Sequence, residues 1–510
     1  MLWLRVARSV GWRACIAGAF LFTVMSPQTT QPGGASTQAG TDREQAAHHD
    51  QRGVAAAQSG DLTAAIQQFQ AALRLEPAFA EALYHLALAY ERGGRTDDAI
   101  SAYEEVLRLH PDLVEARYML AECCAKRGDF EGELRLLSEV VARKPEFAEA
   151  RYNYGLALTK QNRGTEALQQ LRAAAKLNPA NPKIAMALGV ALADRDARQA
   201  VEVLRSAVRL EAANAETHYN LALALAANGD DDEARQEFHA ALSLKPNHPS
   251  ARRGLAVTLM HQGKLELAAG ELRRALEIAP EDAEAANNLG MVELRRKDTT
   301  AAIEALEQAV RWNPQLIKAH FNLAQAYQRA GRVADARRES GRGAELTAEQ
   351  RNRGRAMVLV ESAEQALEAG ELAASIARLR EAVAADPPFP AAHLRLGSAL
   401  RESGGDADQA LAELRRVLQL DPECAEAHYQ IGLTLERARR EAAALDEFRI
   451  AVDMAPCRVE FMQALGRAAL EAGQWAEAAA QFRGVLSWRP HDDDSRIAFE
   501  RAVAQRDRVR

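Results

Sequence analysis

AETHYNLALALAANGDDDEARQEFHAALSLKPNH, residues 215–248, carries the clearest structural signal in the chain. Alanine and leucine recur at helical spacing in its first half, and alanine and phenylalanine do so in its second half. The two halves are separated by Asn-Gly-Asp at 228–230, a combination that is typical of turns. Pro246 ends the second half, because proline lacks an N–H group and clashes with the preceding helical turn. The stretch therefore predicts a hairpin of two helices.

The same hairpin pattern repeats along most of the chain. Eleven of the 17 prolines occupy the position that Pro246 has, at the end of the second half of a unit. Most of these prolines follow the preceding one after 34 residues. A fixed period of this length is the signature of a repeat architecture rather than of separate globular domains. These prolines are Pro77, Pro111, Pro145, Pro179, Pro246, Pro280, Pro314, Pro387, Pro422, Pro456 and Pro490.

Two small-residue positions indicate how the helices of a hairpin meet. The eighth residue of every unit is glycine or alanine, as at Gly290, and the twentieth is alanine in eleven of thirteen units, as at Ala302. A large residue such as Phe238 stands at the twenty-fourth position in several units. Small side chains on both helices allow a close approach, and the large residue fills the remaining space. We therefore expect closely packed helical hairpins.

This pattern resembles the tetratricopeptide repeat family, over about residues 46–490. The resemblance implies an all-α fold, a right-handed α-solenoid of about thirteen hairpins whose first helices line a concave groove. The tryptophan that the family usually has at the fourth position is absent. Four units have histidine there, which we expect to pack between helices rather than to bind a ligand. These histidines are His218, His320, His393 and His428.

Departures from the repeat suggest how the array is divided. Units 1–9 span residues 46–350, and units 10–13 span residues 356–490. The ninth unit lacks its proline, and the pattern is lost at 351–355, so we expect an irregular junction there, either a kink or an extended helix. Residues 491–510 are predicted to form a capping helix and tail, since terminal repeats need a cover for their apolar face.

The N-terminal region differs from the repeats. Residues 1–26 combine three arginines, no acidic residue and a twelve-residue apolar run, as in a secretory signal peptide. Residues 27–45 follow as a predicted flexible linker. We therefore expect an exported protein, in the periplasm, in the cell envelope or secreted. An uncleaved N-terminal anchor is the alternative, and membrane association is expected through this segment only.

Composition and motifs favour a non-catalytic protein. The net charge is −7 and both signs are interspersed, so no clustered basic face predicts nucleic-acid binding. Neither a phosphate-binding loop, nor a G-x-S-x-G elbow, nor an H-E-x-x-H zinc motif occurs in the sequence. We predict no enzyme activity, no cofactor, no metal site and no small-molecule substrate.

Aromatic and amide residues recur at the fifth and sixth positions of the first helices. Aromatic rings offer apolar area with a polar tip, and asparagine amides can both donate to and accept from a peptide backbone. We predict that this face binds partner proteins or peptides, although the same residues are close to the family's general consensus. The predicted binding residues are Tyr84, Tyr118, Tyr152, Asn153, Tyr219, Asn220, Asn287, Asn288, Phe321, Asn322 and Tyr429.

A basic segment stands out from this acidic chain. Eight arginines and four acidic residues lie between Arg329 and Arg355. We predict that Arg351, Arg353 and Arg355 dock an acidic partner, and the alternative is a long solvated helix.

Together these features predict an exported protein–protein interaction scaffold that binds peptide segments or partner proteins along its groove. Two alternatives remain open at this point. The chain could be a targeting or regulatory subunit for a separate enzyme, for example one of the glycosyltransferase kind. It could also be a structural component of a cell-envelope assembly.

Overall fold

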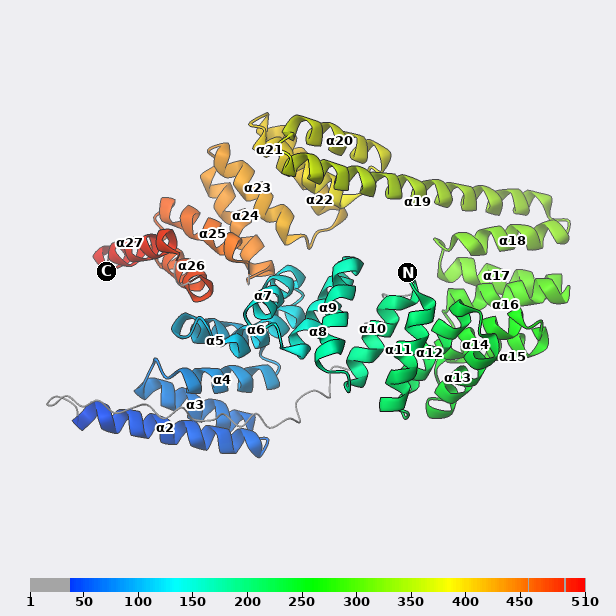
Figure 1. The fold of residues 1–510 in the computed structure, drawn as a ribbon. Helices are drawn as coiled ribbons and strands as arrows, with labels where there is room; N and C mark the ends of the chain where they lie inside the picture. The colour runs from blue at the N-terminus through cyan, green and yellow to red at the C-terminus, as the bar shows by residue number, and fades with distance from the viewer. Residues whose placement is uncertain (1–36, 457, 490–491, 510) are drawn as a thin grey trace. The chain divides into compact units, whose positions relative to one another are not determined.

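The protein is built from helices alone in the part that the structure, a computed structural model, describes: residues 37–456, 458–489 and 492–509. This confirms the predicted all-α class (Figure 1). The helices are α2 (Thr37–Gln58), α3 (Leu62–Leu75), α4 (Ala80–Arg92), α5 (Thr96–Leu109), α6 (Val114–Arg127), α7 (Phe130–Arg143), α8 (Ala148–Lys160), α9 (Gly164–Leu177), α10 (Pro182–Ala193), α11 (Ala197–Leu210), α12 (Ala215–Asn228), α13 (Asp231–Leu244), α14 (Pro249–His261), α15 (Leu265–Ile278), α16 (Ala283–Arg296), α17 (Thr299–Trp312), α18 (Ile317–Arg329), α19 (Val333–Glu368), α20 (Leu372–Ala385), α21 (Pro390–Glu402), α22 (Ala407–Leu420), α23 (Ala425–Arg437), α24 (Glu441–Met454), α25 (Val459–Glu471), α26 (Trp475–Trp488) and α27 (Asp493–Val509).

These helices form an α-solenoid of successive hairpins. In chain order they make thirteen pairs between α2 and α26, because α19 belongs to two pairs. Second helices also pack against the first helix of the next pair, as α11 does against α12 and α17 against α18. First helices of neighbouring pairs touch as well, including α10 with α12 and α16 with α18. Within the second unit, the first helices from α10 to α18 thus touch in series and present their fifth and sixth positions from one layer.

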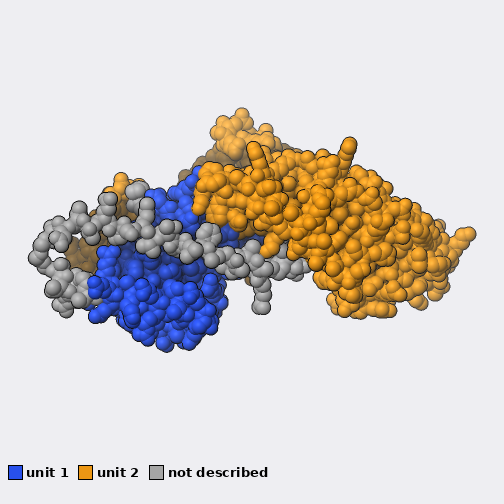
Figure 2. Space-filling model, turned by 60° about the horizontal axis from the view of Figure 1, so that its bottom comes forward, with its two compact units in different colours: residues 1–143, 156–164, 487–490 blue, residues 144–155, 165–486, 491–510 orange. Residues whose placement is uncertain are grey.

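The chain divides into two compact units (Figure 2). The first is built mainly from α2 to α7, and the second mainly from α9 to α27, while α8 contributes residues to both. The division therefore falls near α7 and α8. The junction that the sequence predicted at 351–355 lies inside the second unit.

Glycine and alanine, which have no side chain or a very short one, allow the close helix contacts that the sequence predicted. A Cβ atom placed on Gly290 would lie 2.4 Å from Cγ of Leu306, and one on Gly432 would lie 2.5 Å from Cε1 of Phe448. Both distances are far below van der Waals contact. Ala302, at the twentieth position, is completely buried. The eighth and twentieth positions are small because the facing helix occupies the space of any larger side chain.

Turns between the helices depend on residues that tolerate a left-handed backbone. Gly229 ends α12 with a φ of 88°, and its N–H donates to the carbonyl of Ala226. Glycine adopts this conformation without the steric cost that a Cβ atom brings. Lys297 and Arg439 take φ angles of 69° and 59° at the corresponding ends of α16 and α23.

Helix α19 is the largest departure from the repeat. It runs for 36 residues, from Val333 to Glu368, and serves as the second helix of the ninth pair and the first helix of the tenth. Of the two alternatives for residues 351–355, the structure has the extended helix. The physical reason is the absence of a proline in this segment, because nothing there removes an N–H or forces the chain out of the helical conformation.

The two ends of the described chain are also helical. Helix α2 begins at Thr37, so its first turns take in part of the segment 27–45 that the sequence predicted as linker. Ala46 explains the difference, because it is buried against Ala72 and Ala82 and thereby ties this segment to the first hairpin. At the other end, α27 packs on α25 within the predicted capping segment, and Ser495 N–H donates to Oδ1 of Asp492 at 2.9 Å.

The predicted signal peptide or anchor, residues 1–26, lies outside the described residues. Within the described ranges, every helix is too short or too polar to pass through a bilayer.

Candidate protein-binding face

Three asparagines join α16 and α18 on the first-helix layer of the second unit. Asn322 Nδ2 donates to Oδ1 of Asn287 at 2.9 Å, and Asn287 Nδ2 reaches Oδ1 of Asn288 at 3.5 Å. Asn287 is only 2% exposed, whereas the other two are half-buried. Asn287 therefore supports its neighbours and is not itself open to a ligand.

This arrangement leaves hydrogen-bonding capacity on the accessible amides. An asparagine amide offers two N–H donors and one oxygen acceptor with two lone pairs. In the described part of the chain, the Asn288 NH₂ group and the Asn322 oxygen have no hydrogen-bond partner. One donor and one acceptor therefore remain on adjacent first helices, which is the pairing that a peptide unit requires.

Asn220 is the matching residue on α12. It is 5% exposed, and no hydrogen bond to its amide occurs among the described residues. The Asn220 amide atoms are not among the fully buried polar atoms of the described chain, so water or a ligand can satisfy them. Asn220, Asn288 and Asn322 all occupy the sixth position of their units, and we call these three residues the amide row.

The unit between α12 and α16 lacks an amide at this position. Gly254 stands there on α14, and a Cβ on it would lie 2.5 Å from the Phe238 ring. The preceding residue, Arg253, donates from Nη1 to both carboxylate oxygens of Asp282, at 2.7 and 2.8 Å. Asp282 in turn accepts from backbone N–H groups at the start of α16. This unit therefore contributes a rigid ion pair instead of an amide.

Tyr219 lies beside Asn220 but is mostly a packing residue. Its ring centroid is 4.9 Å from that of His248 and 6.2 Å from that of Phe238, and the side chain is buried. Burial is the main cause that raises the pKa of its phenol. Nearby, His248 is the main cause that lowers the pKa of the Glu216 carboxyl, and its Nε2 lies 3.5 Å from Oε1 of Glu216.

The predicted aromatic residues are divided between the two units. Tyr84 and Tyr118 belong to the first unit, and the remaining predicted residues belong to the second. Tyr84 packs edge-on against Tyr103, and burial is the main cause that raises its pKa to about 12. Tyr118 is half-buried.

In the second unit, the remaining predicted residues differ in accessibility. Tyr152 packs against a small apolar cluster, and Asn153 beside it is half-buried. Tyr429 is half-buried too and stacks on Phe461 with a centroid separation of 4.5 Å. Phe321 is 42% exposed next to Asn322, so it is the aromatic residue best placed to offer apolar area beside the amide row.

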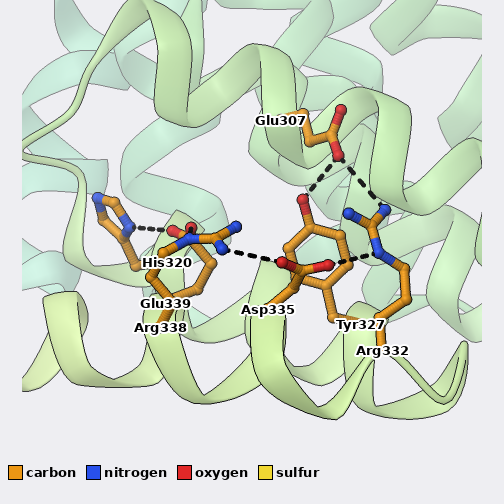
Figure 3. Close-up of polar contacts among 7 residues, drawn as sticks. All are labelled: Glu307, His320, Tyr327, Arg332, Asp335, Arg338 and Glu339. Atoms are coloured by element: carbon orange, nitrogen blue, oxygen red, sulfur yellow. Dashed lines mark hydrogen bonds and ion pairs between the residues drawn. The ribbon is translucent and has the colours of Figure 1, made fainter.

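The fourth-position histidines connect the two helices of their hairpins, and Figure 3 shows this for His320. His320 Nδ1 lies 2.8 Å from Oε2 of Glu339 on the second helix, and its Nε2 lies 3.0 Å from the carbonyl oxygen of Pro314. His218 and His393 make the same two contacts in their units. Arg252 makes them with both ends of its guanidinium. This position thus holds a donor that bridges the two helices and the preceding loop.

A second polar network closes the ninth pair (Figure 3). The Tyr327 hydroxyl donates to Oε1 of Glu307 at 2.6 Å, which connects α18 to α17. Arg332 lies over the Tyr327 ring at 4.1 Å and donates to Asp335 at the start of α19. Burial is the main cause that raises the Tyr327 pKa to about 12. Sequence spacing gave no sign of this network, because its members come from three different helices.

In the described part of the chain, no three histidine, cysteine or carboxylate side chains lie close enough together to hold a metal ion.

The three arginines predicted to dock an acidic partner have different surroundings. Arg353 is bound within the chain, since it pairs with the buried Asp386, reaches the carbonyl of Pro388 and lies over the Phe389 ring at 4.9 Å. Arg351 and Arg355 are exposed, and neither has a partner among the described residues. The docking prediction therefore depends on these two and not on Arg353.

Solved structures of helical-repeat proteins are similar to this chain. A structure titled "APC/C hetero-tetramer Cut9-Hcn1" is 16% identical and covers 92% of this chain and 99% of its own, with a TM-score of 0.37. MamA from Desulfovibrio magneticus RS-1 is 28% identical over 32% of this chain and 94% of its own, with a TM-score of 0.30. The C-terminal part of a TPR repeat-containing protein from Cytophaga hutchinsonii is 17% identical over 47% and 99%, with a TM-score of 0.38.

No curated protein matches this sequence. Family models described as tetratricopeptide repeat do match it, and one of them alone covers more than half of the chain. That model matches residues 51–113, 92–140, 134–182, 232–283, 255–317, 361–405 and 403–456. Two further tetratricopeptide repeat models match residues 293–355 and 215–248. With the helical hairpins, their period and their small contact positions, these matches establish that the chain belongs to the tetratricopeptide repeat family.

Proposed function

We propose that this protein is an exported, non-catalytic scaffold that binds a peptide segment of a partner protein along the amide row. Repeats of this family generally mediate protein–protein interaction, which supports the coarser part of the proposal. The observation that carries the finer part is the free hydrogen-bonding capacity of Asn288 and Asn322, held in place by the buried Asn287.

The chemistry of the amide row fits a peptide main chain. The Asn288 NH₂ group can donate to a peptide carbonyl, and the Asn322 oxygen can accept from a peptide N–H. Phe321 adds exposed apolar area beside them, and ordering its ring costs little conformational entropy. Main-chain hydrogen bonds supply affinity in such a mode, and side-chain contacts select the partner.

Export is the part of the proposal that rests on sequence alone. Three arginines and an apolar run in residues 1–26 support it. N-terminal sequencing of the protein purified from its source cells tests this part separately. A chain that begins after the apolar run supports export by cleavage, and an intact Met1 contradicts it.

The binding proposal is tested by affinity capture from source-cell extract, with residues 37–510 as bait because α2 begins at Thr37. One variant bait carries Asn220→Ala, Asn288→Ala and Asn322→Ala. A matched control bait carries Asn228→Ala, Asn247→Ala and Asn352→Ala, which replace three exposed asparagines outside the sixth position of the repeat. Circular dichroism first checks that all baits are equally helical.

The proposal predicts that mass spectrometry finds a specific set of proteins with the wild-type and control baits, and that the amide-row variant loses this set. Equal capture by all three baits would contradict it. That outcome would favour a structural role in an envelope assembly, or attachment to a separate enzyme, through another face of the array.

A further inference from the structure

The middle of α19 stands apart from the rest of the array. Eight consecutive residues, Ala348–Arg355, are exposed, although they lie inside a continuous helix. A helix that is polar on all sides typically bridges two packed regions through solvent. Here the packed regions are the ninth and tenth hairpins, which α19 joins.

The two halves of α19 bury different sides. The first half buries Ala336, Gly343 and Leu346. The second half buries residues of the tenth hairpin, beginning with Ala356 and Val360. At 3.6 residues per turn, the mean directions of these two buried groups differ by about 120° around the helix axis. One sector of the helix surface therefore faces away from both groups. That sector stays open to solvent between Arg337 and Arg355.

Three arginines share this open sector with two alanines. At about 100° per residue they fall within about 60° of one another around the helix axis. All five are exposed. We call this set the α19 arginine face, and its members are Arg337, Ala344, Ala348, Arg351 and Arg355.

Among the arginines of α19, those of this face are the ones that no acidic residue of the described chain neutralises. Asp335 is paired with Arg332 and Arg338, while Glu345 and Glu349 are paired with Arg342. By contrast, none of the arginines on the α19 arginine face has a partner among the described residues. The unpaired positive charge of α19 is therefore concentrated on one open side of the helix.

The shape of the face suits a second helix. Ala344 and Ala348 have short side chains, so the backbone of a partner helix can approach closely between the arginines. Arg337 and Arg351 are 14 positions apart, which is about 21 Å along an α-helix. A partner of matching length would carry carboxylates near both of its ends.

We propose that the α19 arginine face binds an acidic α-helix of a partner protein. Charge complementarity selects this occupant, because the free arginines offer bidentate donors to carboxylates. The face uses residues on α19 that the amide row does not include. This second contact is therefore independent of peptide binding by the asparagines.

The test uses the full chain and a fluorescent probe peptide of about 20 residues, rich in alanine, with glutamate pairs about 14 residues apart. Fluorescence anisotropy measures binding at about 50 mM and about 300 mM NaCl. The variant Arg337→Glu, Arg351→Glu and Arg355→Glu reverses the face. The control variant Arg209→Glu, Arg311→Glu and Arg415→Glu makes the same charge change at exposed arginines elsewhere, also without partners among the described residues.

We expect the face variant to bind the probe at least about tenfold more weakly, and the control variant to bind like the wild type at the higher salt concentration. Equal losses in both variants would overturn the proposal, since they would reflect only the net charge. Absence of binding to the wild type would overturn it too. If reversal instead changes the sedimentation of the protein alone, the face joins copies of this chain and the proposal is wrong.

The amide-row variant serves as a further control in this experiment. It should bind the probe like the wild type, because Asn220, Asn288 and Asn322 are not on α19. If the α19 proposal fails in this experiment, the peptide-binding proposal is not affected. If the peptide-binding proposal fails in the capture experiment, the α19 proposal is not affected.

Discussion

Gly290 and Leu306 show at residue scale why the repeat tolerates little change at its contact positions. The leucine side chain occupies the space where a Cβ atom of residue 290 would stand. The sequence predicted this contact correctly, because small and large residues recur at fixed positions in thirteen units. A periodic pattern averages over many copies, and this makes such contacts the most predictable part of the fold.

We predict that Gly290→Ala destabilises the protein by about 1–3 kcal/mol, because the added methyl group overlaps Leu306. Gly270→Ala is the matched control, since the space around Gly270 in α15 is open. Alanine there should stabilise the protein by about 1 kcal/mol through its better helix propensity. Urea unfolding of both variants measures the two effects, and a neutral Gly290→Ala would contradict the packing argument.

The bridge made by His320 gives a second prediction. His320→Ala removes both contacts and leaves the Pro314 carbonyl and the Glu339 carboxylate without this donor, which should cost about 1–3 kcal/mol. His320→Arg should retain most of the stability, because Arg252 makes the same two contacts in its own unit. Thermal unfolding compares the two variants, and equal losses would show that a hydrogen-bond donor at this position is not what matters.

Glu216 gives a prediction about pH. Its pKa is lowered, first by His248, whose Nε2 lies 3.5 Å from Oε1 of Glu216, and then by Lys245, so the folded state favours the carboxylate. The stabilisation is present above the carboxyl's unfolded pKa of about 4.3 and is lost as the pH falls through the folded value. We expect Glu216→Gln to be less stable than wild type near pH 7, and we expect the difference to shrink as the pH falls below about 4. A constant difference in urea midpoints across this range would refute the linkage.

Other residue-scale features could not be predicted from the sequence. Asn287 and Asn288 look equivalent as neighbours, yet only the helix packing decides that the first is buried and the second accessible. From the sequence, Arg353 looked like a free docking residue. In the structure it pairs with Asp386, which follows 33 positions later in the chain, at the end of α20. Such contacts depend on the three-dimensional fold, and the repeat pattern of the sequence does not reveal them.

At the scale of elements, α19 is the feature that distinguishes this array. The lost proline of the ninth unit predicted either a kink or an extended helix, and the choice depends on whether anything interrupts the backbone hydrogen bonds. No proline lies between Val333 and Glu368, and the glycines within this helix stay in the helical conformation. The result is one element that belongs to two hairpins.

We predict that Gln350→Pro breaks this element. The residue is exposed, so the change removes no packing, but proline in a helix interior costs about 3 kcal/mol. The two ends of α19 should remain folded on their own hairpins, and the unfolding transition should split into two. Gln350→Ala is the control and should unfold like the wild type. Hydrogen exchange that stays slow around residue 350 in the proline variant would contradict the account.

At the scale of the whole molecule, a repeat protein offers a long surface whose parts can act separately. Each hairpin touches mainly its neighbours, so local changes should alter one region without unfolding the rest. This separation permits two independent binding faces, the amide row on first helices and the α19 arginine face. The sequence could predict the array and the first-helix face, but it could not predict which residues on that face remain open.

Photo-crosslinking from a first helix and from a second helix tests the central claim most directly. Benzoylphenylalanine replaces either Phe321 on α18, where it keeps an aromatic ring beside the amide row, or the exposed Glu304 on α17, and each protein is irradiated in source-cell extract. The account predicts that position 321 crosslinks to a specific partner and that position 304 does not. Crosslinks from position 304 alone would contradict it and would place partner binding on the second helices.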